Sequence, residues 1–238
     1  KIIKMKENIN IAVNFEVLVW AREALALSRT NATEKTGISA KRLTQLEEGD
    51  KQPTLDELKE LSKAYKRTIA TLLLTKPPKE KPLPTDRRTI ESKDIGFFHE
   101  KTILAIRKAR ALVVSLVELK QDAGIAISKF QYKALIQDDA KSIANKLRKE
   151  LKLDEVRQFE NINYAFDAYI EKVESLGVAV FQLSLTQDQL RGFSMVDEVV
   201  PIIGIKRGGE QATAKIFTLF HELGHILLND GGLCDLSE

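Results

Sequence analysis

Residues 216–228 read IFTLFHELGHILL, and within them His221, Glu222 and His225 follow the H-E-x-x-H pattern. Histidines four residues apart project from the same side of a helix, so both imidazoles can bind one metal ion. Neutral imidazole nitrogen suits Zn²⁺, and a carboxylate beside the ion can accept a proton from a water molecule bound to it. The pattern therefore predicts a helix on which His221 and His225 bind Zn²⁺ and Glu222 is the catalytic acid/base.

The rest of this helix bears on whether the motif is a metal site or a coincidental polar pair on an exposed surface. One apolar stripe runs along it, made of Ile216, Leu219, Phe220, Leu223 and Leu227. The histidines point away from that stripe and are flanked by Phe217 and Leu228, so the helix is apolar on almost every side. We expect such a helix to be buried, and buried imidazoles and carboxylates need partners that offset their desolvation. A metal ion is the simplest partner, which favours the metal site.

A zinc hydrolase site also needs a third protein ligand and an open position for water. The residues after the helix offer four candidates, Asp230, Cys234, Asp235 and Glu238, and each has an ordinary structural alternative. The residue pattern does not choose among them. Because no further helix follows to cover such a site, we expect the chain to be C-terminally incomplete.

Before this helix, the composition and the predicted secondary structure of the sequence change twice. Residues 14–74 show turn signals between short helical segments and no strand-like alternation, which predicts a compact all-α domain. Residues 76–89, KPPKEKPLPTDRRT, hold four of the six prolines, so we expect a linker without helix or ladder. Beyond it, helices are predicted at residues 102–119, 138–151, 159–176 and 211–228, and strands at 178–184, 192–196 and 199–205.

The composition excludes several classes of protein. With 43% apolar and 30% charged residues among 238, the chain has the make-up of an ordinary globular protein. It has no run of about 18 apolar residues and no features of a secretory signal at its start, so we expect a cytoplasmic protein with no membrane partner. Cys234 is the single cysteine and cannot form an internal disulfide. The net charge of +3 permits nucleic-acid binding without arguing for it.

Between Ser28 and Gly49 the sequence predicts a helix, a tight turn and a second helix. Gly37 supplies the turn, Ser39 is a natural N-cap and Gly49 is a C-terminal stop. The predicted core comprises Trp20, Leu25, Ile38, Leu43, Leu46, Leu55, Leu58 and Leu61. We interpret the segment as a helix-turn-helix module, whose second helix enters the major groove of double-stranded DNA.

Five polar residues are the candidates for DNA contact: Arg29, Lys41, Arg42, Thr44 and Gln45. Arg42 and Gln45 have the donor and acceptor geometry for guanine and adenine, while Arg29 and Lys41 suit phosphates. The alternative is that these are solvated residues of a module used for dimerisation or protein docking. Ten Lys and Arg stand against nine Asp and Glu in residues 14–75, so the electrostatic drive toward DNA is small.

Several segments together resemble the ImmA/IrrE family of zinc metallopeptidases, in particular members with an N-terminal Xre/Cro-type helix-turn-helix. They are PLPTDRR at residues 82–88, IRKAR at 106–110, GFS at 192–194, VPIIGI at 200–205 and the helix at 216–228. The resemblance implies an α+β chain. An all-α Xre/Cro-type domain occupies residues 10–75, a Pro- and charge-rich linker 76–93, and a zincin-like domain with a small mixed sheet 94–238.

The resemblance also implies roles for individual residues. The family carries the two helix histidines as ligands and the helix glutamate as acid/base, which transfers to His221, His225 and Glu222. Its acidic third ligand lies on a later helix, for which Glu238 is at best a poor stand-in. Family members cleave a DNA-bound repressor, so we expect a DNA-binding transcriptional regulator fused to a zinc metallopeptidase, with a repressor or other regulatory protein as its substrate.

A second function stays open. The chain could be a transcriptional repressor or antitoxin-like regulator whose zincin-like domain senses a ligand or partner without proteolysis. A homodimer is compatible with either function. The strand at residues 199–205 could add an extended substrate as a further strand, or serve only to pack the sheet on the metal helix.

Overall fold

The structure is a computed structural model that describes residues 10–86, 98–158, 161–185, 190–197 and 199–235. The chain divides into two compact units, residues 1–82 and 83–238. The first is helical and the second combines a mixed sheet with helices, so the fold class is α+β, as the sequence predicts. No helix in the described ranges is both long enough and apolar enough to cross a membrane.

The first unit consists of short helices, each begun by a side chain that accepts a backbone N–H. They are α1 (Phe15–Glu23), α2 (Arg29–Thr36), α3 (Ala40–Glu47), α4 (Leu55–Tyr65) and α5 (Ile69–Leu72), capped by Asn14, Ser28, Ser39, Thr54 and Thr68. Six of the eight predicted core residues are buried. Of the other two, Trp20 is half-buried beneath the Arg67 guanidinium, 4.4 Å from its ring centroid, and Leu55 is 43% exposed at the first position of α4.

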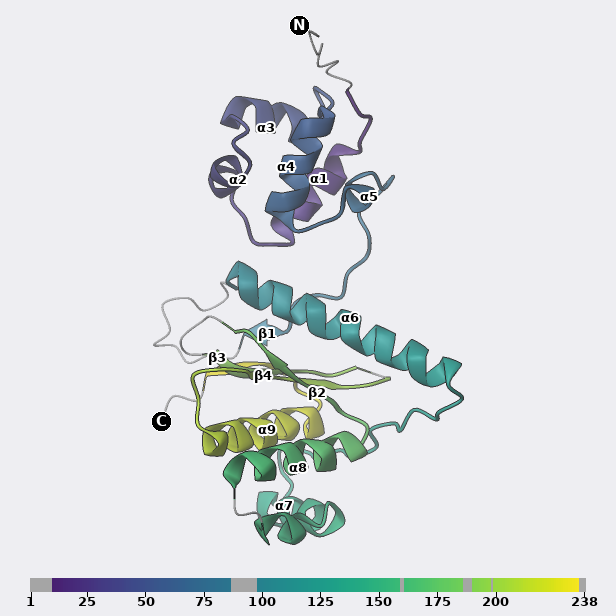
Figure 1. Ribbon diagram of the computed structural model, residues 1–238, viewed down its shortest axis with the longest axis vertical. Helices are drawn as coiled ribbons and strands as arrows, with labels where there is room; N and C mark the ends of the chain where they lie inside the picture. The colour runs from purple at the N-terminus through teal and green to yellow at the C-terminus, as the bar shows by residue number, and fades with distance from the viewer. Residues whose placement is uncertain (1–9, 87–97, 159–160, 186–189, 198, 236–238) are drawn as a thin grey trace, which may run out of the picture. The chain divides into compact units, whose positions relative to one another are not determined.

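The second unit is a five-stranded sheet between layers of helices. Its helices are α6 (Glu100–Asp122), α7 (Ala140–Glu150), the 3-10 turn η1 (Leu153–Gln158), α8 (Ile162–Ser175) and α9 (Ala212–Leu227). Its strands are β1 (Thr85–Asp86), β2 (Ala179–Leu183), β3 (Leu190–Met195), β4 (Ile202–Lys206) and β5 (Gly232–Asp235). Figure 1 shows α6 along one face of the sheet and α8 and α9 along the other.

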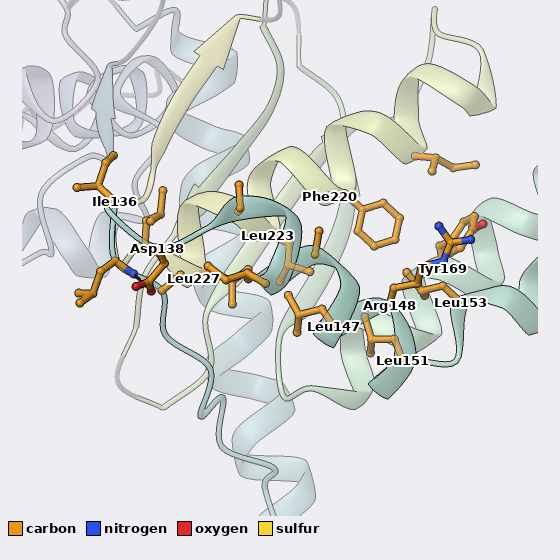
Figure 2. A pocket seen from close by; sticks show the side chains of 18 residues that line it. Ile136, Asp138, Leu147, Arg148, Leu151, Leu153, Tyr169, Phe220, Leu223 and Leu227 are labelled. Carbon is orange, nitrogen blue, oxygen red and sulfur yellow. Dashed lines mark hydrogen bonds between the residues drawn. The ribbon is translucent and has the colours of Figure 1, made fainter.

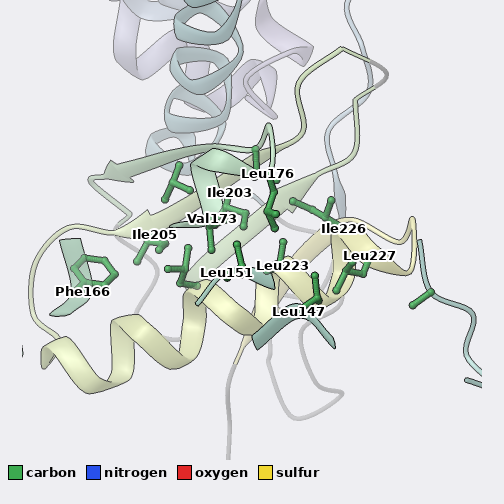
Figure 3. Packing of buried hydrophobic residues seen from close by; sticks show 14 of the residues in the cluster. Leu147, Leu151, Phe166, Val173, Leu176, Ile203, Ile205, Leu223, Ile226 and Leu227 are labelled. Atoms are coloured by element: carbon green, nitrogen blue, oxygen red, sulfur yellow. The ribbon is translucent and has the colours of Figure 1, made fainter. Parts of the chain in front are cut away.

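The strand order is β1-β5-β3-β4-β2, with parallel pairs at both edges and antiparallel pairs around β3. Successive side chains of β4 point to opposite faces of the sheet and so join two different hydrophobic clusters. Ile203 and Ile205 join the apolar cluster under α8 and α9 that Figure 3 shows, whereas Ile202 joins the cluster under α6. Since α9 fills one of these faces, its orientation is set by the sheet.

One expectation about strands is wrong, and of the two roles left open for another strand only packing within the sheet remains. Thr85 and Asp86 form a ladder with β5, although they fall in the stretch expected to be unpaired. The last proline of that stretch is Pro84, so both residues keep the backbone N–H that a ladder needs. The strand expected at residues 199–205 has its regular part at β4, which pairs with β2 on one side and β3 on the other. It is interior to the sheet and has no free edge for an extended substrate.

Candidate metal centre and nucleic-acid interface

Helix α9 presents the two histidines together. Their Nε2 atoms lie 3.1 Å apart, the ring centroids are 4.8 Å apart, and both side chains are half-buried. Two nitrogens bound at about 2.0–2.1 Å to one tetrahedral zinc ion are roughly 3.3 Å from each other. Burial also lowers the pKa of His221, which favours the neutral imidazole that a metal needs. The histidine pair therefore fits Zn²⁺ as two of its ligands.

Glu222 lies between these ligands in sequence but faces the sheet. Its side chain is 1% exposed, and burial raises its pKa to about 8, although the nearby Ser194 hydroxyl offsets part of the shift. Neither Glu222 Oε2 nor Ser194 Oγ makes a hydrogen bond of ordinary geometry within the described part of the chain. A buried carboxylate oxygen without a donor is costly unless something else meets it. Glu222 Oε2 therefore calls for a partner beyond the described residues, such as water or a cation.

The close approach of α9 to β3 depends on Gly192. A Cβ at this position would lie 2.6 Å from Thr218 Cγ2 and 3.3 Å from Glu222 Cγ. Only glycine leaves room for the helix at this distance, so Gly192 sets how deeply Glu222 is inserted. The sequence marked Gly192 and Ser194 only as part of a family-like segment, and their roles follow from the packing.

The third metal ligand is not found in the described residues, where no group of three His, Cys, Asp or Glu side chains gathers. Asp230 donates its backbone N–H to the His225 carbonyl at 2.8 Å, which ties the loop to the end of α9. Cys234 and Asp235 lie on β5, which pairs with β3 beside the helix. Glu238 lies outside the described residues.

The helix-turn-helix is built as the sequence predicts. Gly37 ends α2 in the left-handed conformation at φ 68°, Ser39 Oγ accepts the Arg42 backbone N–H at 3.3 Å to begin α3, and Gly49 follows the end of α3 at φ 82°. One feature was not predicted: the Glu47 side chain, at the end of α3, is fully buried and accepts hydrogen bonds from Arg22 of α1 and Arg29 of α2. This pairing locks the orientation of α3.

The five candidate DNA contacts fall into three groups. Lys41 is exposed near the start of α3, and Thr44 and Gln45 are half-buried on the same helix. Arg29 is half-exposed, with its Nε donating to Glu47 at 2.8 Å. Arg42 is held by Glu57 of α4: its Nε and Nη2 donate to the carboxylate at 2.7 and 2.8 Å, and Nη2 also donates to the Gln52 carbonyl at 3.0 Å. Because Nε and Nη2 are engaged, Arg42 can make the two-bond contact to guanine only if some of these bonds open.

Comparison with known families agrees with both halves of this description. A family model described as helix-turn-helix matches residues 18–72, and one described as IrrE N-terminal-like domain matches residues 173–238. The second match begins within α8 and includes β2 to β5 and α9. No curated protein matches the chain. The two matches confirm the family resemblance inferred from the sequence.

Proposed function

We propose, from the premise that this chain joins an Xre-type helix-turn-helix domain to an IrrE N-terminal-like domain, that it is a DNA-binding transcriptional regulator with a zinc-dependent peptidase centre. Its substrate would be a repressor or another regulatory protein in the cytoplasm. The observation that carries the proposal is the convergence of two imidazole nitrogens, 3.1 Å apart, next to a buried carboxylate with an unbonded oxygen.

In this proposal His221 and His225 hold the metal and Glu222 handles protons. Bound Zn²⁺ supplies a Lewis acid that polarises a peptide carbonyl and makes water more acidic. The charge of a bound cation would lower the raised pKa of Glu222, and the ionised carboxylate would accept a proton from the attacking water and deliver it to the leaving amine. Burial against β3 keeps the carboxylate in one place, because Thr218 and Gly192 pack around it. The third ligand stays a proposal, with Glu238 the candidate and Asp230, Cys234 and Asp235 the alternatives.

Metal binding can be tested with an internal control, because the chain has three histidines and only two belong to the proposed site. We expect purified full chain to bind one zinc ion, and His221→Ala or His225→Ala to lose it. His99→Ala is the matched control, since His99 is exposed at the start of α6, and should keep the metal. Equal zinc content in all four proteins would disprove the site.

Proteolysis is tested separately with the zinc-loaded chain and a proteome-derived peptide library read by mass spectrometry. Glu222→Gln keeps the shape of the side chain and should abolish cleavage while retaining zinc. Glu171→Gln, at an exposed position of α8, is the control and should cleave as the parent does. Zinc binding without any cleavage that depends on Glu222 would instead support a regulator that does not cut its partner.

For the DNA-binding half we propose that Thr44 and Gln45 contact the major groove and that Arg29 and Lys41 contact phosphates. A homodimer would place two α3 helices on successive half-sites. Selection from a random duplex library with the full chain should yield a preferred sequence, and Gln45→Ala should relax one position of it. Lys63→Ala on α4, whose side chain is 73% exposed, should leave the preference unchanged. A chain that binds all sequences equally would refute base readout by α3.

The alternative, a regulator whose second domain senses a small ligand, is favoured by one observation of a different kind. A large apolar cavity lies against α9 on the side away from Glu222.

A further inference from the structure

The cavity has a volume of about 570 Å³ and lies between α7, α9 and the turn at residues 134–138. Figure 2 shows Leu147 of α7 and Leu151, which caps that helix, on one side and Leu223 and Leu227 of α9 on the other. Sites for small molecules have volumes of about 300–1,000 Å³ and mainly apolar walls. The cavity matches both descriptions.

The two ends of the cavity are also apolar. At one end Tyr169 of α8 packs edge-on against Phe220, with ring centroids 5.4 Å apart. At the other, Leu135 and Ile136 are 59% and 89% exposed on a turn that is fixed to α9, because Ala134 N–H donates to the Leu227 carbonyl at 2.9 Å. Large exposed apolar side chains that continue an apolar cavity mark a binding surface.

Charged side chains stand only at the two ends of the cavity, and each already has a hydrogen-bond partner. Asp138 accepts the Leu135 backbone N–H at 2.8 Å, at the end of the cavity near Ile136. Arg148, at the opposite end, donates to Asp154 through Nε at 3.1 Å and Nη2 at 2.6 Å. A charged ligand would have to bury its charge against the apolar walls between these two ends, which costs free energy. The occupant that fits is neutral.

The middle of the α9 wall is open. Gly224 lines the cavity, and a Cβ built there would meet no atom within 4 Å. This position lies between Leu223 and His225, so the cavity wall and the histidine pair belong to the same turn of α9. Whatever fills the cavity therefore contacts the helix that carries the candidate metal ligands, on a neighbouring face.

We propose that this cavity is a binding site for a neutral, largely apolar small molecule. The proposal does not require α9 to bind zinc or to cleave a peptide. It adds a ligand site that neither family match specifies, through which a small molecule would bind the second unit.

The test uses a matched pair of fluorescent probes, the neutral 1-anilinonaphthalene and its anionic 8-sulfonate, titrated into the full chain. We expect saturable binding of one neutral probe per chain and binding of the sulfonate weaker by about 10-fold or more, a difference of about 1.4 kcal/mol. Ala144→Phe fills the cavity from an exposed position of α7 and should weaken the neutral probe by a similar factor. Asn145→Phe adds the same ring at the next exposed residue, which does not line the cavity, and should bind like the parent chain.

Three outcomes would overturn the proposal: no saturable binding of the neutral probe, tighter binding of the sulfonate, or equal effects of the two phenylalanine variants. Self-association is measured in parallel by sedimentation. If Ala144→Phe abolishes a dimer that Asn145→Phe retains, a second copy of the chain fills the cavity and the small-molecule site is refuted.

Discussion

Removing the Glu47 carboxylate should destabilise the helix-turn-helix unit more than any exposed ion pair would. Glu47 is fully buried and accepts from Arg22 Nε at 2.6 Å, Arg22 Nη2 at 3.2 Å and Arg29 Nε at 2.8 Å. The Arg22 side chain is 9% exposed, whereas that of Arg29 is 50% exposed. In Glu47→Ala, Arg29 can turn to water, but Arg22 keeps only the Leu27 carbonyl at 2.8 Å and an exposed carboxylate, Glu23, at 3.4 Å.

The expected cost follows from this difference in exposure. Breaking a buried ion pair by removing one partner costs about 3–5 kcal/mol, because the other charge stays buried. A unit of 82 residues has a stability of about 4–12 kcal/mol at the usual 0.05–0.15 kcal/mol per residue, so most of it would be lost. Arg29→Ala removes a half-exposed partner and should cost less than about 1 kcal/mol. Arg22→Met combined with Glu47→Leu leaves no buried unpaired charge and should recover at least half of the loss.

Trp20 makes the measurement specific to this unit, because it is the only tryptophan in the chain and lies on α1. Urea unfolding of the full chain, followed by its fluorescence, gives the free energy of unfolding of the first unit. Glu48→Ala, at the exposed next residue, is the matched control and should change that free energy by less than about 0.5 kcal/mol. A loss below about 1 kcal/mol in Glu47→Ala, or a double variant no more stable than the single one, would refute the reasoning.

Three further predictions concern other contacts. Gly192→Ala brings a Cβ to 2.6 Å from Thr218 Cγ2, so the second unit should lose about 1–3 kcal/mol in calorimetry and cleavage should fall, while Gly208→Ala, which meets nothing within 4 Å, should change neither. The bonds from Arg42, with a backbone bond from Thr54, hold the pKa of Glu57 below its ordinary 4.5 despite partial burial, so the stability they add is present above pH 4.5 and is lost as the pH falls through the folded-state pKa. The gap in urea midpoint between the parent and Glu57→Gln, read from Trp20, should therefore narrow below pH 4.5, and a constant gap would contradict this. Gly224→Ala places a methyl group in open space within a helix, so it should stabilise the second unit by about 0.5–1 kcal/mol and raise its unfolding temperature. A lower unfolding temperature would show that the cavity wall at α9 is packed more tightly than the structure indicates.

The sequence predicted what depends on local spacing and missed what depends on distant partners. His221 and His225 are four residues apart, so the helix alone brings their rings together. Arg42 lies fifteen residues from Glu57, and the sequence of the recognition helix does not indicate that its guanidinium donates hydrogen bonds to this carboxylate. The same holds for β5: residues 232–235 follow a Gly-rich stop signal and are a strand only because β1 and β3 lie on either side. Secondary structure within each unit could be predicted from the sequence, whereas the hydrogen-bond partners of the charged side chains could not.

The two faces of α9 allow the metal and the cavity to influence each other. Residues 222–225 form one turn of this helix. Leu223 and Gly224 line the cavity, whereas Glu222 faces β3 and His225 faces the other histidine. A ligand changes zinc affinity only if it binds the metal-loaded and metal-free forms of that turn differently, and any such coupling must be equal in both directions. The affinity of the neutral probe should therefore be measured with and without zinc, and that of zinc with and without the probe. If each ligand changes the affinity of the other by the same factor, and that factor differs from one, the cavity regulates the metal helix. If neither affinity changes, α9 is held rigidly by the sheet and the two sites are independent.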